Sequence, residues 1–177
     1  MSERDEAMRG SFGGVVVDRD GKILLRTPRG GFGGYAWTFA KGGGEPEESA
    51  EQAALREVLE ETGWECRIVG PIAGRFEGEN TITSYFLMEP LRQLSPPDRE
   101  TAELRWVTPK TAAQLLAETT SEVGRERDLA VLAAALAKHA RESPAPGAGG
   151  RSVRALEQRV ADDPRTARSE AEKDGDV

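Results

Sequence analysis

The stretch from Gly42 to Trp64 reads G-G-G-E-P-E-E-S-A-E-Q-A-A-L-R-E-V-L-E-E-T-G-W, and it holds the most informative pattern of the chain. Residues 49–62 have apolar side chains at helical spacing. Gly63 follows them at a position where a helix-terminating glycine is typical. The pattern therefore predicts a helix over 49–62, entered from a glycine-rich loop.

This predicted helix carries acidic residues that its own stability does not explain. Glu57, Glu60 and Glu61 stand in its last turns, where the helix dipole disfavours negative charge. Their i, i+3 and i+4 spacing places them on one face, within an arc of about 100°, opposite an apolar side. A solvated acidic surface is the ordinary explanation of such a pattern. A divalent cation is the other explanation, because magnesium binds carboxylate oxygens and would neutralise their repulsion.

The spacing of the fixed residues favours the cation. The stretch resembles the Nudix box, G-x5-E-x7-R-E-U-x-E-E-x-G-U, in which U is a bulky apolar residue. The matching residues are Gly42, Glu48, Arg56, Glu57, Glu60, Glu61 and Gly63. Trp64 occupies the last U position, where an aliphatic residue is more usual, and this departure concerns packing. The flanking segments 37–42 and 103–107 are also similar to the family, so the resemblance covers residues 10–140.

The resemblance implies a role for each matched residue. The expected metal ligands are Glu57, Glu60, Glu61 and the backbone carbonyl of Lys41. The residues expected to act in catalysis are Glu57, Arg56 and Glu48. Glu57 would also orient or deprotonate the attacking water, and Arg56 would brace the glutamates by charge-assisted hydrogen bonds, with Glu48 as its partner. The expected cofactor is Mg²⁺, for which Mn²⁺ can substitute.

The implied reaction is attack of water on a phosphorus atom of a diphosphate, with metal activating the water. The expected substrate is a nucleoside diphosphate linked to another group, and nucleoside or dinucleoside polyphosphates are preferred. Diphosphoinositol polyphosphates and oxidised nucleoside triphosphates remain open. The alternative from another class is a Nudix module that senses a nucleotide or binds RNA without cutting. Such modules commonly lose glutamates of the box, and this chain retains them all.

Outside the box, four residues are candidates for substrate binding: Arg26, Arg75, Tyr85 and Glu103. The two arginines end or interrupt predicted strands and suit a phosphate chain, and Tyr85 suits stacking on a base. Glu103, or Glu100 near it, suits a further carboxylate of the site. For each of these residues, a surface charge or a place in the core is the alternative.

The remaining pattern predicts mostly strands. They are expected over 13–17 and 22–26, joined as a hairpin by the turn at 18–21, and over 37–39, 66–76, 81–88 and 104–107. Glycines 42–44 are expected to break the third strand, and residues 28–35 to form a mobile loop bordering the site. Helices are expected from residue 109 and over 125–139. This order indicates an α+β fold, and the resemblance specifies a Nudix-type α/β/α sandwich with a mixed sheet and a central loop–helix–loop metal site.

Length and composition indicate the domain organisation, the kind of partner and the location of the protein. The 177 residues suit one domain, with a flexible N-terminus over 1–9, a Nudix hydrolase domain over 10–141 and a C-terminal tail over 142–177. The tail lacks aromatic residues and is rich in charge, which predicts disorder. The net charge of −7 argues against a nucleic-acid surface and leaves a small phosphorylated substrate as the expected partner. No signal segment, long apolar run or cysteine pair is present, so we expect a cytoplasmic protein without a membrane partner. The oligomeric state stays open.

Overall fold

The computed structural model describes residues 8–143. The chain divides into two units, Met1–Arg141 and Glu142–Val177, and the fold described here belongs to the first. The predicted flexible terminus over 1–9 and the predicted tail over 142–177 lie almost entirely outside the described residues. Within residues 8–143, none of the helices combines the length and apolar composition of a membrane-spanning segment.

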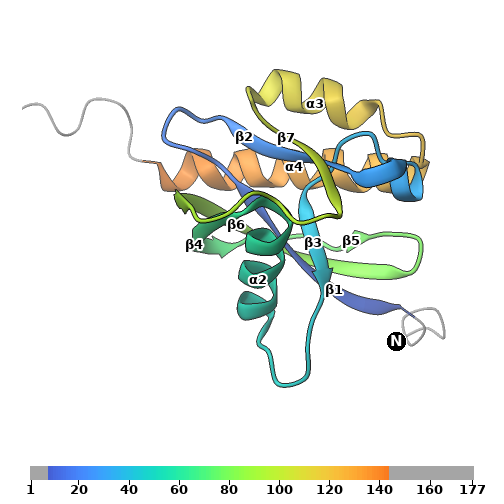
Figure 1. Cartoon of the computed structure of the whole chain (residues 1–177). Helices are drawn as coiled ribbons and strands as arrows, with labels where there is room; N and C mark the ends of the chain where they lie inside the picture. Colours follow the sequence, from blue (N-terminus) through green and yellow to red (C-terminus); the bar gives the residue numbers. More distant parts are fainter. Residues whose placement is uncertain (1–7, 144–177) are drawn as a thin grey trace, which may run out of the picture. The chain divides into compact units, whose positions relative to one another are not determined.

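Strands and helices follow one another along the described chain as the sequence pattern predicts in outline (Figure 1). The strands are β1 (Arg9–Val16), β2 (Ile23–Pro28), β3 (Ala40–Gly43), β4 (Trp64–Pro71), β5 (Phe76–Glu77), β6 (Thr81–Gln93) and β7 (Thr101–Val107). The helical segments are the 3₁₀ segment η1 (Arg29–Gly34) and the helices α2 (Ala50–Thr62), α3 (Pro109–Ala117) and α4 (Glu122–Glu142).

The larger sheet is mixed, which confirms the predicted sheet type. Its strands lie in the order β3-β1-β6-β4, and β5 pairs with one part of β6. β1 runs parallel to β6, whereas β3, β4 and β5 are antiparallel to their neighbours. β2 and β7 form a separate antiparallel pair.

Helices cover both faces of this sheet, so the expected α/β/α sandwich is confirmed. Side chains of a strand alternate between its two faces. Val15 of β1 therefore joins a core cluster with α3 and α4, through residues such as Leu116 and Leu132. The next residue, Val16, joins a second cluster with Val58 of α2. Figure 1 shows α2 and α3 on different sides of the strands.

β1 and β2 do not pair as the predicted hairpin. The turn between them forms, with the backbone N–H of Asp18 donating to the carbonyl of Lys22 at 2.9 Å. Beyond the single bridge between Val17 and Ile23 the strands diverge, β1 into the larger sheet and β2 toward β7. Residues 13–16 of β1 and 23–26 of β2 are buried on both faces, so these parts of the strands lie between layers. Each strand pairs with segments that are distant in the sequence.

The strand predicted over 37–39 forms three residues further along the chain, as β3. The prediction that glycines 42–44 break this strand is wrong, because two of these glycines belong to it. β3 includes Gly42 and Gly43, which pair with Phe12 and Ser11 of β1. Thr38 makes only an isolated bridge to Arg26. The ladder with β1 outweighs the low intrinsic strand preference of glycine, because strand formation depends strongly on tertiary context.

Candidate active site

The helix that carries the box glutamates begins and ends where the sequence predicts. The Ser49 side chain accepts a hydrogen bond from the backbone N–H of Gln52 at 3.2 Å, and the Gln52 side chain accepts one from the backbone N–H of Ser49 at 2.9 Å. This reciprocal arrangement is a capping box. Gly63, with φ of 74°, ends the helix in the left-handed conformation. Both ends of α2 are thereby fixed.

Arg56 lies at the centre of a network of acidic side chains. Its Nε and Nη2 donate to the two carboxylate oxygens of Glu48 at 2.8 and 3.0 Å. Its Nη1 lies 2.9 Å from a carboxylate oxygen of Glu57 and 3.4 Å from one of Glu60. Nη2 also donates to the backbone carbonyl of Gly43 at 2.8 Å. One guanidinium therefore holds the loop before α2, the helix and β3 together.

Glu57 packs directly over Gly42 of β3. A Cβ built on Gly42 would lie 2.2 Å from the carboxyl carbon of Glu57, so any larger residue would displace that side chain. Burial raises the pKa of Glu57, and the hydrogen bond from Arg56 opposes this shift. The box glycine before the helix therefore leaves room for a carboxylate.

Glu61 is not part of a solvated acidic surface. It is buried, with its Oε1 2.9 Å from Nη1 of Arg26 and its Oε2 accepting from the backbone N–H of Lys41 at 2.9 Å. Arg26 also donates to the side chain of Thr101 at 2.8 Å, and Thr101 donates to the backbone carbonyl of Glu61 at 2.8 Å. Burial raises the pKa of Glu61 to about 7, and the charge of Arg26 opposes the shift.

A cavity of about 570 Å³ opens beside Glu61. Its lining consists of Arg26, Pro28, Arg29, Phe32, Tyr35, Thr38, Lys41, Glu61, Arg99 and Glu100. Four of these residues are cationic, and two are acidic. A volume of this size is in the ordinary range for a small-molecule site. The cavity can accept an anionic ligand next to a carboxylate of the box.

Thr38, in the wall of the cavity, is hydrogen-bonded to the buried side chain of Asp128. Thr38 donates to Asp128 at 2.7 Å, and Arg127 of the same helix donates twice to that carboxylate, at 2.9 and 2.7 Å. The Tyr35 ring lies beside two cations, with the Lys41 Nζ 5.5 Å and the Arg127 guanidinium carbon 5.3 Å from its centroid. These contacts fix one aromatic and one amine in the wall.

Two of the four predicted substrate residues are placed away from the cavity in exposed positions. Arg75 precedes β5 and forms an ion pair with Glu77. Glu103 is exposed on β7 and pairs with Arg105 at 2.6 Å. Glu100, the other acidic candidate, does line the cavity.

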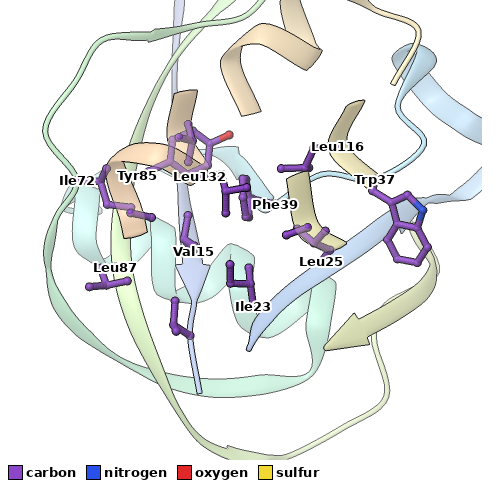
Figure 2. Close-up of a cluster of buried hydrophobic side chains, with 14 of the residues drawn as sticks. Val15, Ile23, Leu25, Trp37, Phe39, Ile72, Tyr85, Leu87, Leu116 and Leu132 are labelled. Carbon is purple, nitrogen blue, oxygen red and sulfur yellow. The ribbon is translucent and has the colours of Figure 1, made fainter. Parts of the chain in front are cut away.

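Tyr85 lies in the core (Figure 2). It is 1% exposed, and its ring makes edge contacts with Phe39 and Phe76 at centroid distances of 6.2 and 5.7 Å. A ring enclosed in this way has no free face for a base. Of the predicted substrate residues, only Arg26 lines the cavity, and its guanidinium is engaged by Glu61.

Arg29, Phe32 and Arg99 line the cavity without having been selected from the sequence. No motif marks them, because they come from two loops that the fold brings together. The backbone N–H of Arg29 donates to the carbonyl of Glu100 at 2.8 Å, and its Nε donates to the carbonyl of Arg99 at 2.6 Å. The sequence marks only Phe32 of these three residues, as an aromatic residue between two pairs of glycines.

The donor chemistry of Glu57, Glu60 and Glu61 fits a hard divalent cation. All three supply carboxylate oxygens, which are the ligands that magnesium prefers. Burial raises the pKa of Glu57 and Glu61. As the side chains stand, however, no three acidic, histidine or cysteine side chains within residues 8–143 are gathered closely enough to hold an ion. Their present partners are Arg56 and Arg26. Metal binding therefore requires these carboxylates to come closer together than they stand here.

Comparison with known proteins places this site in a family. A family model described as NUDIX domain matches residues 7–127, which contain the capped helix, the arginine network and the cavity. The match includes the whole box from Gly42 to Gly63.

Individual relatives resemble parts of the chain. An RNA pyrophosphohydrolase of Cronobacter sakazakii is 38% identical over 69 residues, which are 39% of this chain and 37% of that protein. The chain thus matches little more than a third of the length of this curated relative. Among solved structures, the Escherichia coli ORF135 protein is 27% identical, with a TM-score of 0.53 over 78% of this chain and 98% of the other. A NUDIX hydrolase from Nitrosomonas europaea is 19% identical, with a TM-score of 0.58 over 74% and 90%, which shows the shared fold.

Proposed function

This chain belongs to the NUDIX domain family, and on that premise we propose that it is a metal-dependent pyrophosphohydrolase. It cleaves a pyrophosphate bond in a nucleoside diphosphate linked to another group. The observation that carries this proposal is the position of Glu61, a box glutamate in the wall of a cavity that also holds Arg29, Lys41 and Arg99. Cations suited to phosphate oxygens and carboxylates suited to a metal therefore border one space.

The residues that would hold the metal are Glu57, Glu60 and Glu61, with the carbonyl of Lys41. When bound, a divalent cation supplies activation of water and neutralisation of charge on phosphate oxygens. Arg56 fixes the direction of the Glu57 and Glu60 carboxylates through its contacts at 2.9 and 3.4 Å.

Glu57 is the proposed acceptor of the proton from the attacking water. Its carboxylate is half-buried, and burial raises its pKa, which makes it a stronger base than an exposed glutamate. The water oxygen forms a bond to one phosphorus atom, and the bond from that phosphorus to the bridging oxygen breaks. The products are a nucleoside monophosphate and the remaining phosphorylated group. The side chains of Arg29, Lys41 and Arg99 orient the phosphates in the cavity.

The preferred substrate is a nucleoside or dinucleoside polyphosphate. A cavity of about 570 Å³ suits a small phosphorylated molecule, in agreement with the partner expected from the sequence. A second candidate is the 5′-triphosphate end of an RNA, and the relative named RNA pyrophosphohydrolase supports it. The net charge of −7 opposes an extended nucleic-acid surface, so an RNA would be bound through its end. A cytoplasmic location stays a prediction of the sequence.

Product analysis by mass spectrometry tests the proposal. The panel holds normal and oxidised nucleoside triphosphates, dinucleoside polyphosphates, ADP-ribose, nucleotide sugars, diphosphoinositol polyphosphates and a short 5′-triphosphorylated RNA. Each compound is incubated with magnesium, with chelator, and with Glu60→Gln in place of the wild-type chain. Glu51→Gln is the matched control, because Glu51 is an exposed residue of the first turn of the same helix.

Cleavage of one class of compound that requires both magnesium and Glu60 is the expected result. Unchanged cleavage in Glu60→Gln would contradict the assigned role of the box. Binding of a nucleotide without cleavage of any compound, by folded protein with magnesium or manganese, would favour the non-catalytic sensing module.

A further inference from the structure

Residues 30–34 form a loop that presents a single side chain. The sequence there is Gly-Gly-Phe-Gly-Gly, so Phe32 is the one residue of the five with atoms beyond the backbone. The φ angles of the four glycines lie between 63 and 76°, in the left-handed region that favours glycine. The conformation of the loop therefore depends on glycine at each position except that of Phe32.

Both ends of this loop are anchored to other parts of the molecule. At its start, Arg29 donates through its backbone and side chain to the carbonyls of Glu100 and Arg99. At its end, the carbonyl of Gly34 accepts hydrogen bonds from the backbone and the hydroxyl of Thr120, at 2.9 and 3.1 Å. The anchored ends hold the loop beside the cavity.

Phe32 is an exposed apolar residue at the cavity. It is 82% exposed and lines the cavity. Single exposed apolar residues are common on protein surfaces and by themselves indicate nothing. Leu94 is such a residue, 50% exposed and outside the cavity lining. Phe32 differs from it because its ring shares the cavity with Arg29, Lys41 and Arg99.

Phe32 is 82% exposed, so its ring is largely open to solvent. Its neighbours in the sequence are glycines, which have no side chain that could cover the ring. An aromatic ring with open space beside it offers a face for stacking, and any nucleobase can use such a face. The other aromatic of the lining, Tyr35, is already beside the Lys41 and Arg127 cations. Phe32 is therefore the aromatic of the cavity that is available to a ligand.

We propose that Phe32 is the platform on which the nucleobase of the substrate stacks, while the cationic lining holds the phosphates. This inference rests on the proposed function and narrows it, because a base platform selects nucleotides over diphosphoinositol polyphosphates and other compounds without a base. Phe32 is a specificity residue, since it touches the base and not the reacting phosphorus.

Binding of a nucleoside monophosphate compared with binding of ribose 5-phosphate tests this proposal. The two compounds differ by the base, and neither contains a pyrophosphate bond, so the measurement does not depend on hydrolysis. Dissociation constants are measured by NMR titration of the full chain for AMP, GMP, CMP, UMP and ribose 5-phosphate. The proteins are the wild type, Phe32→Ala, Phe32→Leu, Phe32→Trp and the control Leu94→Ala.

Stacking predicts a specific order of affinities. Phe32→Ala and Phe32→Leu should each weaken binding of at least one nucleoside monophosphate about tenfold, which corresponds to about 1.4 kcal/mol. Phe32→Trp should keep wild-type affinity, because its ring also stacks. Ribose 5-phosphate binding should be the same in all five proteins, and Leu94→Ala should match the wild type for every compound.

Three results would overturn the proposal. If Phe32→Leu bound the nucleoside monophosphates as tightly as the wild type, the side chain would act as an apolar contact and not by stacking. Equal weakening of ribose 5-phosphate by Phe32→Ala would place the effect on the phosphate or sugar. Equal affinity of the wild type for the monophosphates and ribose 5-phosphate would show that no base is bound. If the product analysis showed no hydrolysis but the predicted order of affinities were found, the proposed enzymatic function would be wrong. The proposed role of Phe32 in binding the base would still hold.

Discussion

Arg26 of β2 and Glu61 of α2 form an ion pair inside the protein, with Nη1 and Oε1 2.9 Å apart. The two residues are 6% and 5% exposed. Thr101 of β7 contacts both of them through its hydroxyl group. The pair joins the box helix to the β2–β7 ladder at the wall of the cavity, so it contributes to the fold and to the shape of the candidate site at once.

Removing the cation of this pair is expected to destabilise the protein. Arg26→Met leaves the buried Glu61 without its arginine partner, and the free energy of unfolding should fall by about 3 kcal/mol at pH 8. Urea denaturation measures the change. Arg67→Met is the control, because its exposed ion pair with Glu89 should contribute at most about 1 kcal/mol. Equal small effects of the two substitutions would contradict a structural role for the buried pair.

The packing of Glu57 on Gly42 gives a second prediction. In Gly42→Ala the new methyl group would displace the Glu57 carboxylate, and kcat/KM should fall about a hundredfold. The free energy of unfolding should change by less than about 1 kcal/mol, because a flexible side chain can move aside. Gly43→Ala is the matched control, since a Cβ on this neighbour would meet no atom within 4 Å. Similar kinetics of the two variants would contradict this account.

The network around Arg56 predicts that lysine is not a conservative replacement. Arg56→Lys loses the two-point contact with Glu48 and cannot reach Glu57 and Gly43 at the same time. Steady-state kinetics should show kcat/KM lower by about ten- to a hundredfold. Arg92→Lys serves as the control, since Arg92 pairs with Glu65 on an exposed part of the sheet. Activity in Arg56→Lys equal to that of the control would exclude the bracing role.

The domain boundary predicted from the sequence has its own test. Every lining residue of the cavity and every box residue lies within 10–141. A chain that ends at residue 144 should therefore keep kcat/KM within about twofold of the full chain. A much larger loss would give the segment after residue 144 a part in the site.

Helix α2 was predictable because local chemistry determines it. Ser49 and Gln52 form a capping box, Gly63 provides the left-handed end, and the apolar spacing between them is helical. The same is true of the Arg56 contacts, whose partners on α2 are one and four residues away. Interactions of this short range can be inferred from a single sequence.

The surroundings of α2 were not predictable in this way. The i, i+3, i+4 spacing places Glu57, Glu60 and Glu61 on one face, but Glu61 is buried because Arg26 approaches from a strand of another sheet. The sequence suggested Tyr85 as a base-stacking residue, but in the structure its ring packs against Phe39 and Phe76 in the core. Such outcomes depend on pairing between distant segments, which local periodicity does not contain.

The dependence of hydrolysis on free magnesium tests the central claim most directly. The rate of cleavage of the substrate identified by product analysis would be measured against magnesium concentration for the wild type, Glu60→Gln and Glu51→Gln. The account predicts no turnover in chelator, saturation with magnesium in the wild type and in Glu51→Gln, and a rate lower by about a hundredfold or more in Glu60→Gln. Turnover that is independent of magnesium, or equal rates in Glu60→Gln and Glu51→Gln, would contradict it.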